Sequence, residues 1–441
     1  MPREHQPHRA TKPRNDARER EPRLEPGAAH GPAVTISRRA ADRLRAGHLW
    51  VYRSDLEAIT PALDEESIAP GALVAVLDNR GIPVGSGLWS AASQIAVRVV
   101  SAEPKLTREA YLADLEFRLA SALTLRSALA PTDTTNDSCR LVFAEADQLP
   151  GIVADRYNDL VILQLLAQGT AQDDVREVFT SAVRGHFGDR VATIVERPDP
   201  RVRELEELAP APSAPLFSAN ENDEPKLATV FTINGLQLHY DASAGQKTGA
   251  FLDQRLNYAA AAAHAHGRAL DVCTYQGGFA LHMARTCDHV TGVDASRSAL
   301  EVADRNLELN RGILRAEVDW IEADAFELLR EYEATSQRFD TIVLDPPAFA
   351  KSKRAVEGAL RGYKELNLRA MKMLPAGGTL VTCSCSHHVS REDFLSAIVS
   401  AAADAGRRVQ VLETRAAAPD HPEILTLPET FYLKCILCRM L

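Results

Sequence analysis

The feature that most constrains the fold of this chain is an alternation of short apolar strands with helical segments, which begins near residue 250 and continues to the C-terminus. Such alternation predicts an α/β domain built on a doubly wound, mostly parallel sheet, because each parallel strand needs a crossover to reach its neighbour. The expected strands lie at residues 269–272, 289–294, 318–321, 341–345, 379–383, 409–412 and 431–438. We expect the last strand to be antiparallel, since the interval before it is too short for a helical crossover.

Three aspartates follow the first three strands in order. Asp271 and Asp294 close the first and second strands, and Asp324 comes just after the third. A lone Asp at a strand end often caps the following helix. Three of them at the carboxyl ends of successive strands instead indicate a ligand, because an open α/β sheet binds its ligand at this edge. We expect Asp294 to accept hydrogen bonds from ribose hydroxyl groups, and Asp324 to accept one from an adenine amino group.

The turn after the first strand carries Tyr275, Gly277 and Gly278. Two glycines allow the backbone to approach a ligand closely where a strand passes into a helix. The turn lacks the GxGxxG spacing of a pyrophosphate cradle. The whole set is similar to that of seven-stranded S-adenosylmethionine-dependent methyltransferases, which predicts S-adenosylmethionine as the cofactor. The residues expected to bind it are Asp271, Tyr275, Gly277, Gly278, Asp294, Asp324 and Asp345.

The fourth strand ends in Asp345-Pro346-Pro347-Ala348-Phe349. Two prolines make a rigid turn with few backbone donors, which leaves carbonyl groups and the Asp345 carboxylate free to bind the edge of a flipped base. Phe349 can stack on such a base, although a strand-ending turn with Phe349 in the core would also explain it. Lys351, followed by Lys353 and Arg354, can hold RNA phosphates.

The fifth strand leads into Thr382-Cys383-Ser384-Cys385. Carbon 5 of cytosine is a poor nucleophile, and a thiolate that adds to carbon 6 makes it reactive towards a methyl donor. Cys385 lies just beyond the expected strand end, in the ligand cleft, and is the predicted nucleophile. Cys383 lies within the strand, where a cysteine usually packs as a small hydrophobe. We expect no zinc site, because Cys435 and Cys438 share one strand and a spacing of three points them to opposite faces.

The chain before residue 250 divides by composition. Residues 1–32 are predicted to be a disordered tail, because they hold almost no large apolar residues. Residues 33–103 read as a β-rich domain, residues 104–240 as a central α+β domain, and residues 241–441 as the catalytic domain. Within the central part, residues 204–227 are expected to form a long loop. A basic helix before Trp50 and Tyr52 suits RNA contact, and packing of both rings in the core is the alternative.

Charge and cysteine content bound the remaining choices. The net charge of −10 requires that any RNA-binding surface be local. Seven cysteines in 441 residues, without a secretory signal, fit a reducing cytosol and hence a cytoplasmic protein. No apolar run approaches the length needed to cross a bilayer, so a membrane partner is not expected.

Five separated stretches, in the same order, resemble the RlmI-like class I methyltransferases, which modify cytosine C5 in large-subunit ribosomal RNA. They cover residues 45–52, 145–157, 245–255, 345–349 and 384–386, and the resemblance extends over about 35–441. It implies an N-terminal PUA domain for RNA, a central EEHEE-type domain and a C-terminal Rossmann-like methyltransferase domain. It also implies Cys385 as the nucleophile, with Asp345 orienting the base. The expected substrate contacts are Pro346, Pro347, Phe349, Lys351, Gln246, Lys247, Phe251 and Arg255.

The resemblance implies 23S rRNA as the partner, either naked or in an assembling large subunit, and leaves a homodimer open. The chain departs from the family pattern in its tail, its 204–227 loop and the extra Cys383. Two other functions stay open at this point. One is an RNA N-methyltransferase that acts on guanine N2 or adenine N6 without a covalent step. The other is a non-catalytic RNA-binding factor in ribosome assembly.

Overall fold

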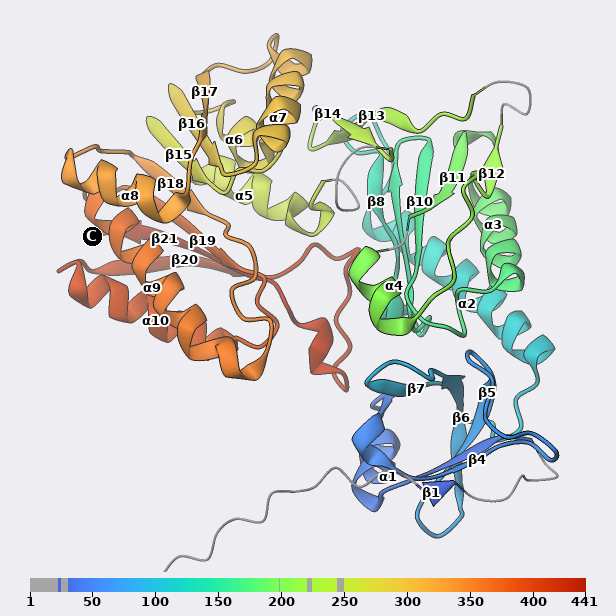
Figure 1. Ribbon diagram of the computed structural model, residues 1–441. Coiled ribbons are helices and arrows are strands. Elements are labelled where there is room, and N and C mark those ends of the chain that lie inside the picture. The colour runs from blue at the N-terminus through green and yellow to red at the C-terminus, as the bar shows by residue number, and fades with distance from the viewer. Residues whose placement is uncertain (1–22, 25–30, 198, 220–223, 244–249) are drawn as a thin grey trace, which may run out of the picture.

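The computed structural model describes residues 23–24, 31–197, 199–219, 224–243 and 250–441. They form three domains along the chain, each built on its own β-sheet (Figure 1). Among these residues no helix combines the length and the apolar character that a bilayer span requires.

The N-terminal domain is a seven-stranded sheet in the order β1-β4-β2-β5-β6-β7-β3, with one α-helix and one 3-10 helix. Its helix α1 (Arg38–Arg45) begins where the Ser37 hydroxyl accepts a hydrogen bond from the Ala40 amide, and Gly47, with φ +95°, follows its C-terminal end. The elements are β1 (Arg23–Leu24), β2 (Ala33–Ile36), β3 (Trp50–Tyr52), η1 (Arg53–Asp55), β4 (Leu56–Thr60), β5 (Leu73–Leu77), β6 (Pro83–Trp89) and β7 (Ile95–Ser101).

Strand β1 corrects part of the expectation for the tail. Arg23 and Leu24 lie within the stretch predicted to be disordered, yet they pair in parallel with Ala58 and Ile59 of β4. Backbone pairing with an open sheet edge needs no apolar side chains, so composition could not reveal it. Residues 1–22 and 25–30 lie outside the described residues.

The central domain packs two long helices, α2 (Arg108–Leu129) and α3 (Asp173–Phe187), against a five-stranded sheet in the order β12-β11-β10-β9-β8. The strands are β8 (Ser138–Phe143), β9 (Ile152–Tyr157), β10 (Leu160–Leu165), β11 (Thr193–Glu196) and β12 (Phe217–Ser218), and the short helices are η2 (Ala144–Asp147), η3 (Gly188–Arg190) and α4 (Pro200–Glu206).

The expected loop at 204–227 is partly structured. Helix α4 extends to Glu206, whose buried carboxylate pairs with Arg98 at 2.7 Å, and β12 adds Phe217 to the sheet opposite Ile194. Both features depend on partners that are distant in sequence, so the local composition of Glu, Ala and Pro did not predict them.

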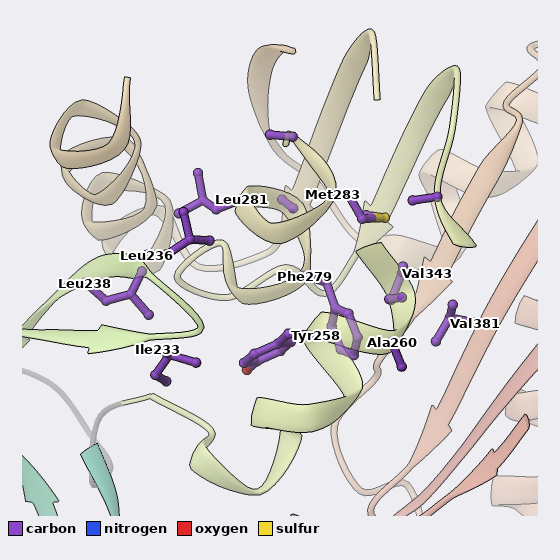
Figure 2. Close-up of a cluster of buried hydrophobic side chains, with 14 of the residues drawn as sticks. Ile233, Leu236, Leu238, Tyr258, Ala260, Phe279, Leu281, Met283, Val343 and Val381 are labelled. Atoms are coloured by element: carbon purple, nitrogen blue, oxygen red, sulfur yellow. The ribbon is translucent and has the colours of Figure 1, made fainter. Parts of the chain in front are cut away.

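A hairpin of β13 (Ala228–Ile233) and β14 (Leu236–Asp241) joins the central domain to the catalytic one. Its turn residues Asn234 and Gly235 both have positive φ, as a two-residue hairpin turn requires. The hairpin packs Ile233, Leu236 and Leu238 beside helices of the catalytic domain (Figure 2). It therefore extends the core of the catalytic domain.

The catalytic domain is a seven-stranded sheet in the order β17-β16-β15-β18-β19-β21-β20. All neighbours are parallel except β21, which runs antiparallel to both β19 and β20, so the predicted doubly wound fold and antiparallel last strand are confirmed. The strands are β15 (Arg268–Val272), β16 (His289–Asp294), β17 (Glu317–Glu322), β18 (Thr341–Leu344), β19 (Thr379–Ser384), β20 (Val409–Arg415) and β21 (Lys434–Met440).

Helices cover both faces of this sheet. Alternate strand residues point to opposite sides, so Val343 and Val381 join one buried cluster, shown in Figure 2, while Ile342 and Leu380 join the other. The helices are η4 (Leu252–Gln254), α5 (Arg255–His264), α6 (Gly278–Met283), α7 (Arg297–Asn310), α8 (Ala325–Ala334), η5 (Lys353–Ala355), α9 (Val356–Met373), α10 (Arg391–Asp404) and η6 (Pro428–Thr430).

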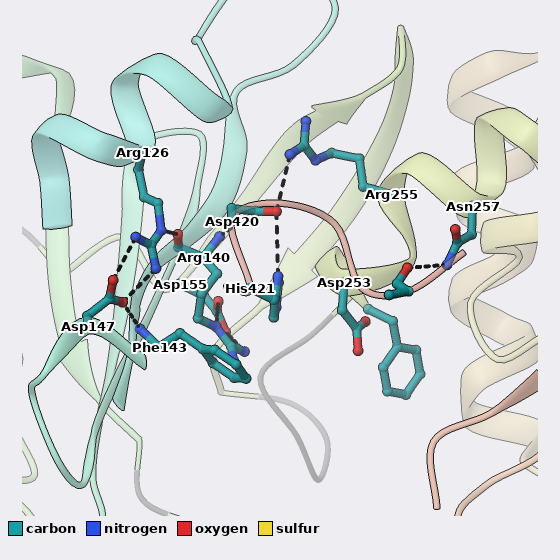
Figure 3. A network of polar contacts seen from close by, with 12 residues as sticks. Arg126, Arg140, Phe143, Asp147, Asp155, Asp253, Arg255, Asn257, Asp420 and His421 are labelled. Atoms are coloured by element: carbon teal, nitrogen blue, oxygen red, sulfur yellow. Dashed lines mark hydrogen bonds and ion pairs between the residues drawn. The ribbon is translucent and has the colours of Figure 1, made fainter. Parts of the chain in front are cut away.

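The connecting segment, residues 416–433 between β20 and β21, contacts all three domains. Asp420 accepts a hydrogen bond from the Arg140 amide of the central domain and pairs with Arg255 of the catalytic domain at 3.2 Å (Figure 3). In the N-terminal domain, Gly47 accepts a hydrogen bond from the Thr426 hydroxyl, and the Tyr52 hydroxyl donates to Glu429.

The two N-terminal aromatic residues lie at these domain contacts. Trp50 and Tyr52 are only half-buried, and the Trp50 indole donates a hydrogen bond to Glu145 of the central domain at 2.9 Å. Neither ring belongs to the apolar core of its own domain.

Candidate active site

Two loops meet at the carboxyl edge of the catalytic sheet. One follows β18 and carries Asp345 to Phe349, and the other follows the adjacent strand β19 and begins at Cys385. The Cys385 thiol lies 3.8 Å from the Pro346 carbonyl oxygen. The Ala350 amide donates to the Ser386 hydroxyl at 3.1 Å. The structure thus brings the predicted nucleophile and the predicted base-binding turn into contact.

Asp345 sits in a half-buried polar position. The Gln254 side-chain amide donates to its Oδ2 at 2.9 Å, and Gln254 in turn accepts a hydrogen bond from Asn257. Burial, followed by the negative charges of Asp253 and Asp271, raises the pKa of Asp345 to about 8. Asp345 therefore carries a proton at neutral pH and can act as a hydrogen-bond donor.

The two neighbouring thiols have different surroundings. Cys385 is half-buried, and burial with the nearby carboxylates of Asp345 and Asp253 raises its pKa to about 12. It is therefore a neutral thiol in this structure and donates to the Pro346 carbonyl. Cys383 is fully buried in β19, opposite Cys435 of β21, within the apolar core. Cys385, unlike Cys383, can meet a substrate.

Phe349 packs beside two other aromatic rings. Its centroid lies 4.8 Å from that of Tyr363 and 5.9 Å from that of Phe326, and the side chain is half-buried. Pro346 is buried, whereas Pro347 is exposed. The surface beside these rings is a shallow depression lined by Phe326, Phe349, Arg354, Glu357, Arg361 and Gly362. The exposed Lys351 follows in the same loop.

Asp271 organises the turn after β15. Its Oδ2 accepts hydrogen bonds from the Thr274 hydroxyl at 2.6 Å and from the Ala280 amide at 2.9 Å. Its Oδ1 is buried without a partner among the described residues. Burial raises the pKa of Asp271 to about 7. The turn also holds Cys273 and Tyr275 at positive φ, which is costly for residues with a Cβ and is common at ligand sites.

The other two strand-end aspartates hold backbone amides. Asp294 accepts from the Tyr275 amide through Oδ2 and from the Ser296 amide through Oδ1, each at 2.9 Å. Asp324 caps helix α8 through Oδ1, which accepts from the Phe326 and Glu327 amides. This capping is what a lone Asp at a strand end is expected to do. The Asp324 Oδ2 atom has no partner among the described residues.

The two glycines have neighbours that explain them locally. Gly277 has φ +86°, a conformation that favours glycine. A Cβ at Gly278 would lie 2.6 Å from Cζ of Tyr258 in helix α5, so this glycine makes room for a protein side chain. The prediction that both glycines approach a ligand stays a prediction.

These residues fit S-adenosylmethionine. Asp271 has an orphaned buried oxygen, and each Asp294 oxygen has accepting capacity beyond its one amide. The Asp324 Oδ2 atom is available at the same sheet edge. Carboxylates so placed can accept hydrogen bonds from the amino and hydroxyl groups of a nucleoside. No group of three His, Cys, Asp or Glu residues within the described parts of the chain is arranged to hold a metal ion.

The predicted stretch 246–255 is divided. Gln246 and Lys247 lie outside the described residues. Phe251 is 39% exposed, and its ring lies 5.1 Å from that of Tyr275. This stretch therefore contacts the turn that follows β15. Arg255 is buried against Asp420, so in this structure its guanidinium stabilises a domain contact.

Several residues at the site were not named individually from the sequence, although Gln254 lies in the 245–255 stretch of the family resemblance. Gln254 binds Asp345, and the Tyr432 hydroxyl donates to Asp253 at 2.6 Å. Tyr363 joins the hydroxyls of Ser384 and Ser386 at 2.9 and 2.8 Å. Lys434 donates to the Ser386 carbonyl at 2.7 Å. The sequence offered one sign of such a residue, the charge of Lys434 at the start of a mostly apolar strand. The other contacts arise only on folding.

Comparison with known families agrees with this architecture. Residues 34–102 match a PUA-like domain, and residues 218–437 match the S-adenosylmethionine-dependent methyltransferase family. A solved structure, SMU.776 complexed with SAH, superposes with a TM-score of 0.75 at 17% identity and covers 92% of this chain and 99% of its own. A candidate SAM-dependent methyltransferase from Streptococcus mutans superposes at 0.74 with the same identity and coverage.

Curated relatives match along almost the whole chain. Ribosomal RNA large subunit methyltransferase I of Klebsiella pneumoniae (strain 342) is 36% identical over 414 residues, which cover 93% of this chain and 98% of the relative. The protein of the same name from Salmonella arizonae is 35% identical over 412 residues, with the same coverage. The chain therefore belongs to the ribosomal RNA large subunit methyltransferase I family of S-adenosylmethionine-dependent methyltransferases.

Proposed function

We propose that this protein forms 5-methylcytosine in 23S rRNA, through a covalent bond between the Cys385 sulfur and carbon 6 of the target cytosine. The observation that carries the proposal is the contact between the Cys385 thiol and the turn of Asp345 and Pro346. Attack on a pyrimidine ring requires a thiolate and a nearby acid that can donate a proton to the ring, and these two residues can supply both. The names of the curated relatives support ribosomal RNA as the substrate.

Asp345 acts as the acid in this proposal. With a pKa raised to about 8, its carboxyl group holds a proton at neutral pH. It donates that proton to N3 of the cytosine, which withdraws electrons from carbon 6. Gln254 orients the carboxyl through its 2.9 Å hydrogen bond.

Cys385 supplies the electron pair. The thiol proton leaves to solvent, the sulfur bonds to carbon 6, and the electrons of the ring double bond make carbon 5 nucleophilic. Bound S-adenosylmethionine, held by the strand-end aspartates, supplies the electrophilic methyl group. Loss of the carbon 5 proton to a base then re-forms the double bond, N3 returns its proton, and the sulfur leaves.

RNA contact is assigned to local basic and aromatic residues. Lys351, Lys353 and Arg354 are exposed directly after the Asp345 turn, where the phosphates flanking a flipped nucleotide would lie. The PUA-like domain offers a second contact. This division accommodates the net charge of −10, because only a small part of the surface needs to be basic.

The test replaces each thiol separately. We expect Cys385→Ala to lower methylation of unmodified 23S rRNA by at least about 1,000-fold, because removal of a covalent nucleophile leaves only catalysis by binding. Cys383→Ala, which alters only core packing, is the matched control and should stay active. Calorimetry checks that both variants still bind S-adenosylmethionine.

Retained turnover by Cys385→Ala would contradict the covalent step. Methylated guanine N2 or adenine N6 in the product, identified by mass spectrometry, would replace it with N-methylation. Absence of cofactor binding by the wild-type protein would instead favour a non-catalytic RNA-binding role.

A further inference from the structure

Lys434 is a buried charge at the start of a mostly apolar strand. It begins β21, is 5% exposed, and lies opposite Ser384 at the end of β19. Burying an ammonium group is costly unless its surroundings compensate it. No carboxylate among the described residues lies within ion-pair distance of its Nζ atom. A salt bridge therefore does not explain why a lysine is buried at this position.

The ammonium group holds the loop that carries Cys385. Its Nζ atom donates to the carbonyl oxygens of Ser386 at 2.7 Å and Val389 at 2.9 Å. Ser386 directly follows Cys385, and its hydroxyl is also tied to Tyr363 and to the Ala350 amide. These contacts fix the backbone next to the thiol. A neutral donor could make both hydrogen bonds, so they alone do not explain a cation.

The charge of Lys434 opposes the negative surroundings of the thiol. Asp345 and Asp253 disfavour a thiolate at Cys385, whereas Lys434 favours it. Five groups from different parts of the chain lie near enough to act on the charge of Cys385: Asp345 after β18, Asp253 in η4, Tyr363 in α9, Tyr432 in the connecting segment and Lys434 in β21. His387, in the loop itself, faces Lys434.

We infer that Lys434 is a positioning residue that stabilises the thiolate of Cys385 with its positive charge while fixing the loop through Ser386 and Val389. This inference deepens the proposed function and rests on Cys385 as the nucleophile. Burial lowers the pKa of Lys434 to about 8. The lysine is therefore charged at neutral pH and loses its effect on the thiol above about pH 8.

Alkylation of Cys385 by iodoacetamide measures this effect without RNA or cofactor. The rate at Cys385 is followed by mass spectrometry from pH 6 to 10 in the full-length protein, with the other cysteines as internal references. Only the thiolate reacts, so the rate follows the thiolate fraction. All proteins in this experiment carry Asp345→Asn, because Asp345, with its pKa raised to about 8, would otherwise gain a charge near the thiol in the same pH range. For this parent protein we expect a roughly tenfold rise per pH unit up to about pH 8, then a bend as Lys434 loses its proton.

Two variants separate charge from shape. Lys434→Gln keeps a donor but no charge, and we expect alkylation about tenfold slower below pH 8, with no bend. Lys434→Arg keeps its charge at every pH used, and its rate should continue to rise past pH 8. Lys372→Gln, which removes the ion pair between Lys372 of α9 and Glu333 of α8, is the matched control and should reproduce the parent profile.

A purely structural role gives a different result. If Lys434→Gln changes the rate by one constant factor and keeps the bend, or coincides with the parent, the inference is wrong. If Lys434→Gln does not fold, the bend in the parent and its absence in Lys434→Arg still decide the matter. The outcome is independent of which base is methylated, so failure here and failure of the Cys385→Ala test remain distinguishable.

Discussion

Burial raises the pKa of two half-buried groups at the site. The Asp345 carboxyl is neutral because burial and two neighbouring carboxylates raise its pKa to about 8. The Cys385 thiol, for the same reasons, needs help to ionise. The residues around them, Gln254, Asp253 and Lys434, set these states and therefore set what the site can do.

Asp345→Asn tests the state of this carboxyl. The folded protein keeps a proton that the unfolded chain releases above about pH 4, so wild-type stability falls as the pH rises towards 8. Asparagine avoids this loss. We expect Asp345→Asn to be more stable than the wild type in urea unfolding. This difference in stability should be larger at pH 8 than at pH 5, by more than about 1 kcal/mol.

The same variant should lose activity. Asparagine can still accept the Gln254 hydrogen bond but has no acidic proton, so we expect kcat to fall by about 10²- to 10⁴-fold. The exposed Asp319→Asn serves as the control and should change neither stability nor kcat. An Asp345→Asn protein that is less stable at pH 8 and fully active would contradict a protonated Asp345.

The sequence predicts single site residues better than their partners. The order of Asp271, Asp294 and Asp324 followed from strand ends, and all three lie at the predicted edge of the sheet. Gln254 and Lys434 were not predicted, because their contacts join residues 91 and 48 positions apart. Arg255 was expected to face the substrate and instead pairs with Asp420, a contact between segments that no local pattern links.

At the scale of elements, the alternation of strands and helices predicted the catalytic sheet well, because a parallel strand buried on both faces is apolar along its length. The sequence did not predict the two shortest strands, because they depend on their neighbours in the sheet. Strands β1 and β12 contain two residues each and owe their existence to the edges they join. Their own side chains carry too little information to predict them.

The contact between α6 and α5 gives a test at this scale. Gly278 opens α6 against Tyr258 of α5, and a methyl group there would lie 2.6 Å from the tyrosine ring. We expect Gly278→Ala to lower the free energy of unfolding by about 1–3 kcal/mol, as overpacking of a buried contact does. Urea unfolding measures this change. Gly312→Ala is the control, because a Cβ there would have no neighbour within 4 Å outside the adjoining residues. Equal effects of the two substitutions would contradict the packing argument.

At the scale of the whole molecule, the connecting segment links the PUA-like and catalytic domains. One end carries Asp420, its middle contacts Gly47 and Tyr52, and its last residues lead to Tyr432 and Lys434 beside the thiol. This stretch of chain therefore contacts all three domains (Figure 1), in addition to the direct contacts of Trp50 with Glu145 and of Arg98 with Glu206.

Asp420→Asn tests this link. Asp420 is fully buried. His421 and Arg255 stabilise its carboxylate and so hold the pKa of Asp420 well below the ordinary value. The substitution leaves the buried Arg255 without a counter-charge, so we expect a loss of about 3–5 kcal/mol in urea unfolding. Because a depressed pKa stabilises the folded state above the unfolded value, the loss should shrink as the pH falls below about 4.

Limited proteolysis supplies the second measurement. Asp420→Asn should be cut within the connecting segment faster than the wild type, and the exposed Asp319→Asn should not. Equal cleavage rates in wild type and Asp420→Asn would show that the segment is held by other contacts.

The central claim is that Cys385 forms a covalent bond to the target base. An RNA that carries 5-fluorocytidine tests it most directly, because a fluorine at carbon 5 cannot be removed as a proton is, so the enzyme stays attached. With S-adenosylmethionine present, wild type and Cys383→Ala should each give a protein–RNA complex that survives denaturing electrophoresis. Cys385→Ala should give none. A complex formed by Cys385→Ala, or the absence of any complex with the wild type, would contradict the account.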